Sequence, residues 1–282
     1  MNCLESLDIP AGVTSVVGSG GKTTLLRALA DELAPRDERV ILATTTHFLA
    51  FPGVPLVTGA DEGELGRALG RSGVVCVGSP VAGGGSDGTP ARALQSPVQA
   101  QAQVQSPARE QMQSPVQAHI VARTCGVAKA LPKLGPSPIP IARLARLADH
   151  VLVEADGSRR LPLKAHATHE PAVPDETARC VLVVGASGFG RAIVEVAHRP
   201  ELFCKRAGCE PNAVATPELV AQVVAAETQS GAIAPDRIVV NQTEEGERRE
   251  EARTLARELA RLGVQSPVLA GSIRAHDLEL IG

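Results

Sequence analysis

The chain carries the stretch Gly18-Ser19-Gly20-Gly21-Lys22-Thr23-Thr24, which follows the apolar run Val13-Thr14-Ser15-Val16-Val17 and leads into a helical pattern. Glycine adopts backbone conformations with φ > 0 and has no Cβ, so several N–H groups of such a loop can converge on phosphate oxygens. Lys22 is placed to meet the β- and γ-phosphates, and the Thr23 hydroxyl to reach Mg²⁺. The start of the helix adds free N–H groups and the positive end of its dipole. We therefore expect residues 18–24 to bind a nucleoside triphosphate together with Mg²⁺.

The spacing of this segment is that of a short G-x-x-G-K-T loop. The longer form has a glycine six residues before the lysine, where this chain has Val16. A short glycine-rich segment can also be a structural turn with a lysine on the surface. The strand before it and the helix after it favour the nucleotide site.

Strand-like and helix-like patterns alternate along the chain. A helix is expected at 24–34, a strand at 39–43, a helix at 62–69 and a strand at 74–77. The second strand ends in Thr44-Thr45-Thr46-His47, where a parallel sheet places its ligand loops. This order predicts an α/β fold, namely a three-layer P-loop-like domain with a mainly parallel sheet.

The composition limits the kinds of partner that the chain is expected to bind. The 282 residues include no Trp, no Tyr and only four Phe, so the core must be built from Val, Leu, Ile and Ala. Aromatic stacking on bases is nearly unavailable, and the net charge is −3 without a block of Lys or Arg. Nucleic acid is therefore not an expected partner.

Neither a signal peptide nor a membrane span is expected. The first ten residues include Glu5 and Asp8 and have no basic segment before an apolar core. No apolar stretch approaches the roughly 18 residues that a membrane helix needs. Six cysteines are scattered along the chain and are expected to be reduced, as in a cytoplasmic protein: Cys3, Cys76, Cys125, Cys180, Cys204 and Cys209.

We expect a single domain over residues 1–282 with an irregular insertion at 79–118. That tract contains Gly83-Gly84-Gly85 and three Gln-Ser-Pro triplets, and it is dominated by Gln, Ala and Pro. Too few large apolar side chains are present to offset the entropy of ordering the chain. The insertion is therefore expected to be disordered and to have no part in the chemistry.

Two carboxylates follow an apolar segment in Val151-Leu152-Val153-Glu154-Ala155-Asp156-Gly157. Alternation along a strand puts Glu154 and Asp156 on the same side. Both are expected to face the phosphate loop as Mg²⁺ ligands with Thr23, and as catalytic groups with Lys22 that position the attacking water. The alternative is a strand end with two solvated acids.

Cations come directly after these carboxylates. Arg159, Arg160 and Lys164, and later Arg199, could hold an anionic substrate or the transferred phosphoryl group, or could form salt bridges in solvated loops. His166, His169 and Glu170 match no standard metal-ligand spacing, because Pro171 and Pro174 argue against a helix there.

Near the C-terminus, Asn241-Gln242-Thr243-Glu244 ends an apolar run at 237–240. The segment is similar to the N-K-x-D motif that reads guanine in GTPases, with Gln242 in place of the lysine and the longer Glu244 in place of the aspartate. Asn241 and Glu244 are candidates to contact the base, so the nucleotide is ATP or GTP. Alternatively, Asn241 caps the following helix.

Taken in order, these segments resemble the YqeC family. The residues that support the resemblance are 18–24, Thr44-Thr45-Thr46-His47, Val153-Glu154-Ala155-Asp156-Gly157-Ser158, Leu163-Lys164-Ala165, His169-Glu170-Pro171 and His198-Arg199-Pro200-Glu201. The resemblance covers nearly the whole chain except 79–118. It implies a P-loop NTPase that assists the maturation of selenium-dependent molybdenum hydroxylases, with such a hydroxylase or its cofactor-maturation proteins as partners.

The expected function is binding and slow hydrolysis of a nucleoside triphosphate. Three alternatives stay open. The loop spacing also resembles the ATP loop of Mur ligases, which would make the chain a ligase or kinase acting on a small acceptor. The chain could be a non-catalytic, nucleotide-gated chaperone. It could also insert selenium or a metal directly through Cys204 and Cys209.

Overall fold

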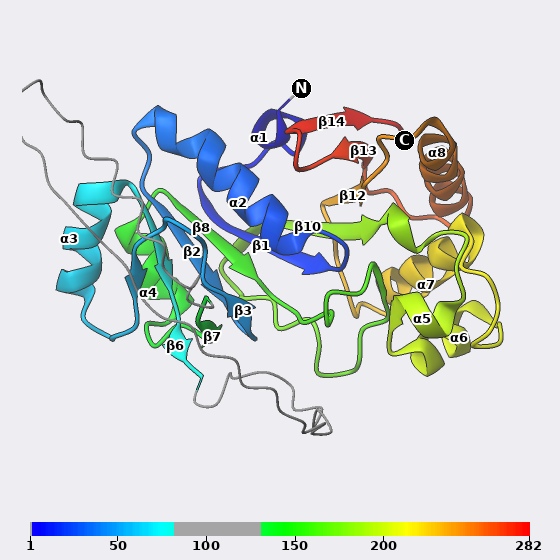
Figure 1. The fold of residues 1–282 in the computed structure, drawn as a ribbon, viewed down its shortest axis with the longest axis horizontal. Coiled ribbons are helices and arrows are strands. Elements are labelled where there is room, and N and C mark those ends of the chain that lie inside the picture. Colours follow the sequence, from blue (N-terminus) through cyan, green and yellow to red (C-terminus); the bar gives the residue numbers. More distant parts are fainter. Residues whose placement is uncertain (1, 82–130) are drawn as a thin grey trace, which may run out of the picture. The chain divides into compact units, whose positions relative to one another are not determined.

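The computed structural model describes residues 2–81 and 131–282, which build a nine-stranded sheet (Figure 1). The strand order is β14-β13-β12-β10-β1-β8-β2-β5-β4. All neighbours are parallel except β13 and β14. The bounds are β1 (Gly12–Gly18), β2 (Val40–Thr44), β4 (Leu56–Val57), β5 (Val74–Val77), β8 (His150–Glu154), β10 (Thr177–Gly185), β12 (Arg237–Asn241), β13 (Val268–Ser272) and β14 (Asp277–Leu280).

The central strands are buried on both faces, as strands of a parallel sheet are. Every residue of β2 and β8 is buried. Strand β1 lies between β8 and β10, with Val16 opposite Glu154 on one side and Val181 on the other. The carboxyl ends of these strands therefore meet at one edge, where the phosphate loop begins.

Helices cover both faces of the sheet. They are α1 (Cys3–Ser6), α2 (Lys22–Leu33), α3 (Glu62–Ser72), α4 (Ile141–Leu147), α5 (Ile193–Val196), α6 (Pro200–Ala207), α7 (Pro217–Gln229) and α8 (Gly246–Arg261), with short 3-10 turns η1 (Ala34–Arg36) and η2 (Ala186–Gly188). Within β10, Val181 and Val183 pack with the α1–α2 core, whereas Leu182 and Val184 pack with the core of α6, α7 and α8. Helices α3 and α4 complete that second face beside Val151 of β8. The predicted three-layer α/β fold with a mainly parallel sheet is confirmed.

Helix boundaries shift by a few residues from the expected ones. Helix α2 begins at Lys22 rather than Thr24, so the lysine is its first residue. Helix α3 begins after Asp61, whose side chain accepts a hydrogen bond from Gly63 N, and it runs three residues past Leu69. These differences leave the order of elements unchanged.

Two small sheets stand beside the main one. Strands β3 (Phe48–Leu49), β7 (Lys133–Gly135) and β6 (Ser79–Pro80) are antiparallel, and β9 (Leu163–Lys164) pairs in parallel with β11 (Ala197–His198). The expected insertion at 79–118 thus begins with a paired strand, and its residues from 82 onward lie outside the described part of the chain. Within residues 2–81 and 131–282, no helix combines the length and the apolar character needed to cross a membrane.

Candidate functional site

The phosphate loop is held in a conformation that only glycine accommodates at three positions. The φ angles are +91° at Gly18, +78° at Gly20 and +148° at Gly21. A Cβ on Gly18 would stand 2.3 Å from the carbonyl oxygen of Val183, and one on Gly20 would stand 2.4 Å from Gly185 Cα. The three glycines are therefore required by both backbone conformation and close packing.

Lys22 is buried, with 4% of its surface exposed. Its ammonium donates to Gly18 O at 2.7 Å and to Ser158 Oγ at 3.3 Å. It also lies 3.1 Å from Asp156 Oδ1 and 3.7 Å from Glu154 Oε1. Lys22 is therefore not the surface lysine of the structural-turn alternative, because the loop folds this cation inward onto two carboxylates; phosphate binding at the loop stays a prediction.

Glu154 ends β8 beside the first turn of α2. Its Oε2 accepts a hydrogen bond of 2.8 Å from Thr23 Oγ1, while Thr23 and Thr24 themselves are exposed. Burial raises the pKa of Glu154 and nearby Asp156 adds to this, although Lys22 and Thr23 act in the opposite direction. Glu154 is thus a desolvated carboxylate next to a hydroxyl.

Asp156 lies two residues further on and is fully buried. Its Oδ2 accepts from Gly18 N at 2.8 Å, from Lys164 Nζ at 2.9 Å and from His166 at 2.8 Å. Burial on its own would raise the pKa of Asp156, but Lys22, His166 and Lys164 together lower it well below its ordinary range. The alternative of two solvated acids is wrong for Glu154 and Asp156, since both are buried and face the loop.

The cations downstream differ in their surroundings. Lys164 contacts Asp156 and also Glu170 at 2.7 Å, and Glu170 receives a two-point contact from Arg199 at 2.7 and 3.0 Å. Although burial opposes it, these two cations lower the pKa of Glu170 to about 2. Lys164 and Arg199 therefore form salt bridges, as the second interpretation of these cations expects. Arg159 and Arg160 are exposed.

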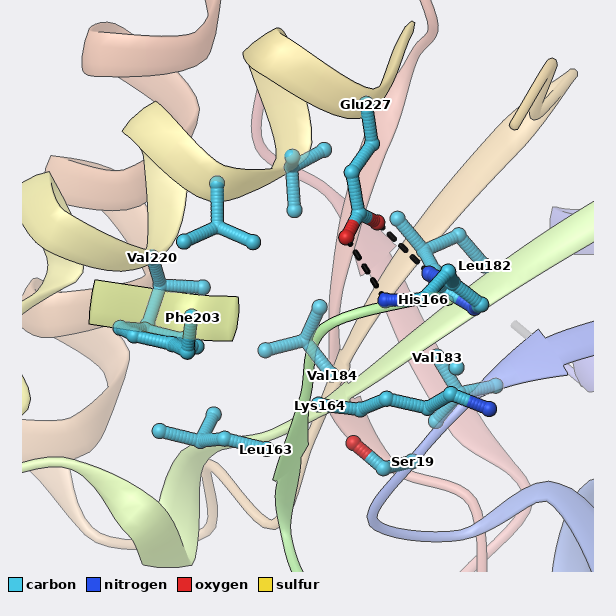
Figure 2. A pocket seen from close by; sticks show the side chains of 13 residues that line it. Ser19, Leu163, Lys164, His166, Leu182, Val183, Val184, Phe203, Val220 and Glu227 are labelled. Carbon is cyan, nitrogen blue, oxygen red and sulfur yellow. Dashed lines mark hydrogen bonds and ion pairs between the residues drawn. The ribbon is translucent and has the colours of Figure 1, made fainter. Parts of the chain in front are cut away.

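Sequence reasoning missed Glu227 and Arg206, which complete this cluster. Glu227 lies in the last turn of α7 and accepts from the His166 backbone N–H at 2.8 Å and from its Nδ1 at 2.6 Å (Figure 2). Arg206, from α6, contacts Glu227 and donates to His166 O at 2.7 Å. The signal was present in α7, because Glu227 follows Val220, Val223 and Val224 at the spacing of the buried face.

Asn241 braces the loop rather than capping a helix. Its Nδ2 donates to Gly20 O at 2.8 Å, and its Oδ1 accepts from Ile273 N at 3.0 Å. Helix α8 starts five residues later, after Glu245, so the helix-cap alternative is wrong. Glu244 is exposed. Contact of Asn241 and Glu244 with a base stays a prediction.

The residues present fit Mg²⁺ beside the loop. Thr23 and Glu154 supply the hydroxyl and carboxylate oxygens that this ion prefers, and Asp156 Oδ1, which accepts no hydrogen bond, is buried against the Lys22 ammonium. Among the described residues, no group of three or more His, Cys, Asp and Glu side chains could hold a metal by itself. The structure gives no support for metal binding at His166, His169 and Glu170.

Cys204 and Cys209 line one surface groove. Burial raises the pKa of Cys204 to about 11, so the reactive thiolate form is disfavoured. The described cysteines are free thiols. These observations favour a structural role over insertion chemistry.

A glycine loop joining the first strand to a helix, a buried lysine at its end and two carboxylates on the neighbouring strand define a P-loop class of α/β protein. The family model described as "YqeC protein" matches residues 14–201, and the chain belongs to the YqeC family.

The chain is also similar to individual proteins. The chain is 31% identical over 206 residues to "Uncharacterized protein YqeC" of Escherichia coli (strain K12), a match that covers 71% of this chain and 62% of that protein. The chain therefore spans less than two thirds of this relative's length. A solved structure of chloroplast FtsY from Physcomitrella patens is similar with a TM-score of 0.40 and 14% identity, over 97% of this chain and 63% of that one.

Proposed function

We propose that this protein binds a Mg²⁺-nucleoside triphosphate, ATP or GTP, and hydrolyses it slowly. The observation that supports this most strongly is the 2.8 Å contact between Thr23 Oγ1 and Glu154 Oε2. A hydroxyl at the start of a helix, a carboxylate on the adjacent strand and a glycine loop between them are what a Mg²⁺-triphosphate site requires. Thr23 and Glu154 would hold the ion, which would draw electron density from the phosphate oxygens when bound.

Lys22 and Asp156 have a separate part in this proposal. In the structure the Lys22 ammonium is neutralised by Asp156 and Glu154. A triphosphate brings negative charge that competes for this ammonium, and the positive φ angles of Gly18, Gly20 and Gly21 let backbone N–H groups of the loop converge on the phosphates. Asp156 keeps Gly18 N–H and Lys164 as partners, so it stays charged and can orient the attacking water.

The test is a panel of ATP, GTP and their diphosphates with Mg²⁺, measured by thermal shift and by a fluorescent-nucleotide titration. A ligand at 100 times its Kd stabilises the fold by about 2.7 kcal/mol. We expect Lys22→Ala to abolish this shift. We also expect it to lower the stability measured without nucleotide by about 3 kcal/mol, because buried Glu154 loses its cation and buried Asp156 loses one of its cations.

The matched control is Lys133→Ala, an exposed lysine on β7. It should leave both the nucleotide shift and the stability near those of the unmodified chain. No shift with any nucleotide at millimolar concentration, or an unchanged shift in folded Lys22→Ala, would refute the proposed function.

We propose in addition that the nucleotide cycle acts in the cytoplasm in the maturation of selenium-dependent molybdenum hydroxylases. Family membership supports this step. A nucleotide-dependent complex with the immature hydroxylase is expected, whereas equal binding with and without nucleotide would favour a scaffold. Transfer of the γ-phosphate to a small acceptor would favour a kinase or ligase.

A further inference from the structure

A chain of polar groups, buried except for the half-buried Arg206 at its end, runs from the phosphate loop to helices α6 and α7. It passes from the Gly18 amide to Asp156, to His166, to Glu227 and to Arg206. We call Asp156, His166, Glu227 and Arg206 the relay. Figure 2 shows His166 and Glu227 pointing toward each other among apolar side chains that include Phe203 and Val220. His166 is 2% exposed and Glu227 is 1% exposed.

Each contact in the relay constrains the next one. Both ring nitrogens of His166 lie against carboxylate oxygens, of Asp156 on one side and Glu227 on the other, so both must donate. The two nitrogens of the Arg206 fork contact Glu227 and the His166 carbonyl, which ties α6 to α7 and to the segment after β9. A buried carboxylate with three donors cannot lose one of them without a large free-energy cost. The imidazole orientation is therefore fixed by Glu227 and Arg206.

Asp156 is the end of the relay at the phosphate loop, and nucleotide binding must alter the charges around it. Lys22 lies 3.1 Å from Asp156 Oδ1, and under the proposed function this cation turns to the phosphates. Asp156 then depends on Lys164 and His166 for compensation. Next to His166, a cavity of about 20 Å³, with room for about one water molecule, is lined by Ser19 of the loop and by Phe203 and Val224 of α6 and α7. The packing thus leaves the helices some freedom to follow a shift of the relay.

We propose that His166, Glu227 and Arg206 are positioning residues that fix the orientation of Asp156, and that they couple occupancy of the phosphate loop to helices α6 and α7. The inference rests on the proposed function, because nucleotide is the ligand that the relay senses. It assigns a role to a Glu and an Arg that touch neither the loop nor its expected ligand. Coupling of this kind is an energetic link between two regions through groups with defined contacts.

The test is hydrogen exchange of the backbone amides of α6 and α7, measured without nucleotide and with a saturating concentration of nucleotide and Mg²⁺. The nucleotide is whichever of AMP-PNP and GMP-PNP binds more tightly. In the unmodified chain, we expect exchange there to change by about fivefold or more. Glu227→Gln should retain nucleotide binding, since Lys22 and the glycines are intact, but should lose this response. The control Glu218→Gln, an exposed acid in the first turn of α7, should keep it.

Arg206→Lys provides a second variant in case Glu227→Gln does not fold. It keeps the charge but loses the fork that spans Glu227 and His166 O, so the response should weaken while binding persists. Nucleotide binding without a change at α6 and α7, or an unchanged response in folded Glu227→Gln or Arg206→Lys, would overturn the relay alone. Absence of nucleotide binding in the unmodified chain would overturn the proposed function and the relay together.

Discussion

Glu154 and Asp156 differ more than their neighbouring positions suggest. They are two residues apart at the end of one strand, both are buried and both lie within 4 Å of Lys22. Nevertheless, the pKa of Glu154 is raised and that of Asp156 is lowered. Glu154 accepts one hydrogen bond from Thr23, whereas Asp156 accepts three strong ones and lies against Lys22 as well.

The difference indicates that Glu154 and Asp156 have different roles at the two ends of the loop. Asp156 is matched by Lys22, Lys164 and His166, so its charge supports the structure. Glu154 shares Lys22 with Asp156 and lacks a full partner of its own, so its charge is costly until another cation arrives. The Asp156 side of the loop supports stability, and the Glu154 side is where we propose that Mg²⁺ binds.

The largest expected effect is that of Asp156→Asn. The change leaves Lys164 and His166 buried with less negative charge and removes an acceptor for Gly18 N–H, so we expect a loss of about 3–5 kcal/mol in the free energy of unfolding at pH 7. Because the pKa of Asp156 is lowered in the fold, its contribution is present above the ordinary aspartate pKa and is lost as pH falls. Urea unfolding of both proteins between pH 7 and pH 3 measures the difference.

The exposed Asp31, paired with Arg27 four residues before it, gives the control for Asp156. Asp31→Asn should change stability by about 0.5 kcal/mol or less, as exposed helix pairs do. If Asp156→Asn were no more harmful than Asp31→Asn, the assignment of Asp156 to structural support would be wrong.

Much of this site could be predicted from sequence because it depends on local rules. The glycines, Lys22 and Thr23 follow from a motif, and Glu154 and Asp156 both contact Lys22, although β8 ends at Glu154 and Asp156 lies in the segment after the strand. What could not be predicted is the burial of Lys22 and the pairing of Asp156 with His166. Those contacts depend on the loop at 157–162, which lies against the phosphate loop through Ser19 and Pro162.

Glu227 and Arg206 illustrate a second limit. They lie 71 and 50 positions after Asp156 in the sequence, on helices whose placement over the sheet no local pattern specifies. A charged residue on the apolar face of α7 signals a buried partner, but it does not say which one. Asn241 is similar, since its spacing from Glu244 suggested a base contact while its side chain holds Gly20 O.

A smaller effect is expected from Asn241→Ala, which extends the comparison to the Gly20 end of the loop. The change leaves Gly20 O and Ile273 N without partners in a buried setting, so we expect a loss of about 2 kcal/mol in stability. If Asn241 only braces the loop, the ratio of ATP to GTP affinity stays the same. Thermal unfolding and competitive nucleotide titration measure the two effects.

Glu244→Ala is the companion variant, because Glu244 is exposed. It should leave stability unchanged. A shift in the ATP to GTP ratio in both variants would show that the two residues read the base, and would assign Asn241 a role beyond bracing.

An effect on stability smaller than that of Asn241→Ala is expected from Glu154→Gln, and its sign is opposite to that of Asp156→Asn. A pKa raised in the fold means that the carboxyl group favours folding when protonated, and that this contribution is lost as pH rises through the folded-state pKa. A neutral amide avoids the cost of burying a charge, so without nucleotide Glu154→Gln should be more stable than the unmodified chain by about 1 kcal/mol at pH 8, and by less at pH 5.

The same variant should lose the dependence of nucleotide affinity on Mg²⁺, because the carboxylate oxygen beside Thr23 is gone. Thr23→Val should lose that dependence too, without the gain in stability. Urea unfolding at the two pH values tests the stability prediction, and nucleotide titration with and without Mg²⁺ tests the Mg²⁺ prediction. If Glu154→Gln instead destabilised the fold as strongly as Asp156→Asn, both carboxylates would support the structure, and the proposed division between them would not hold.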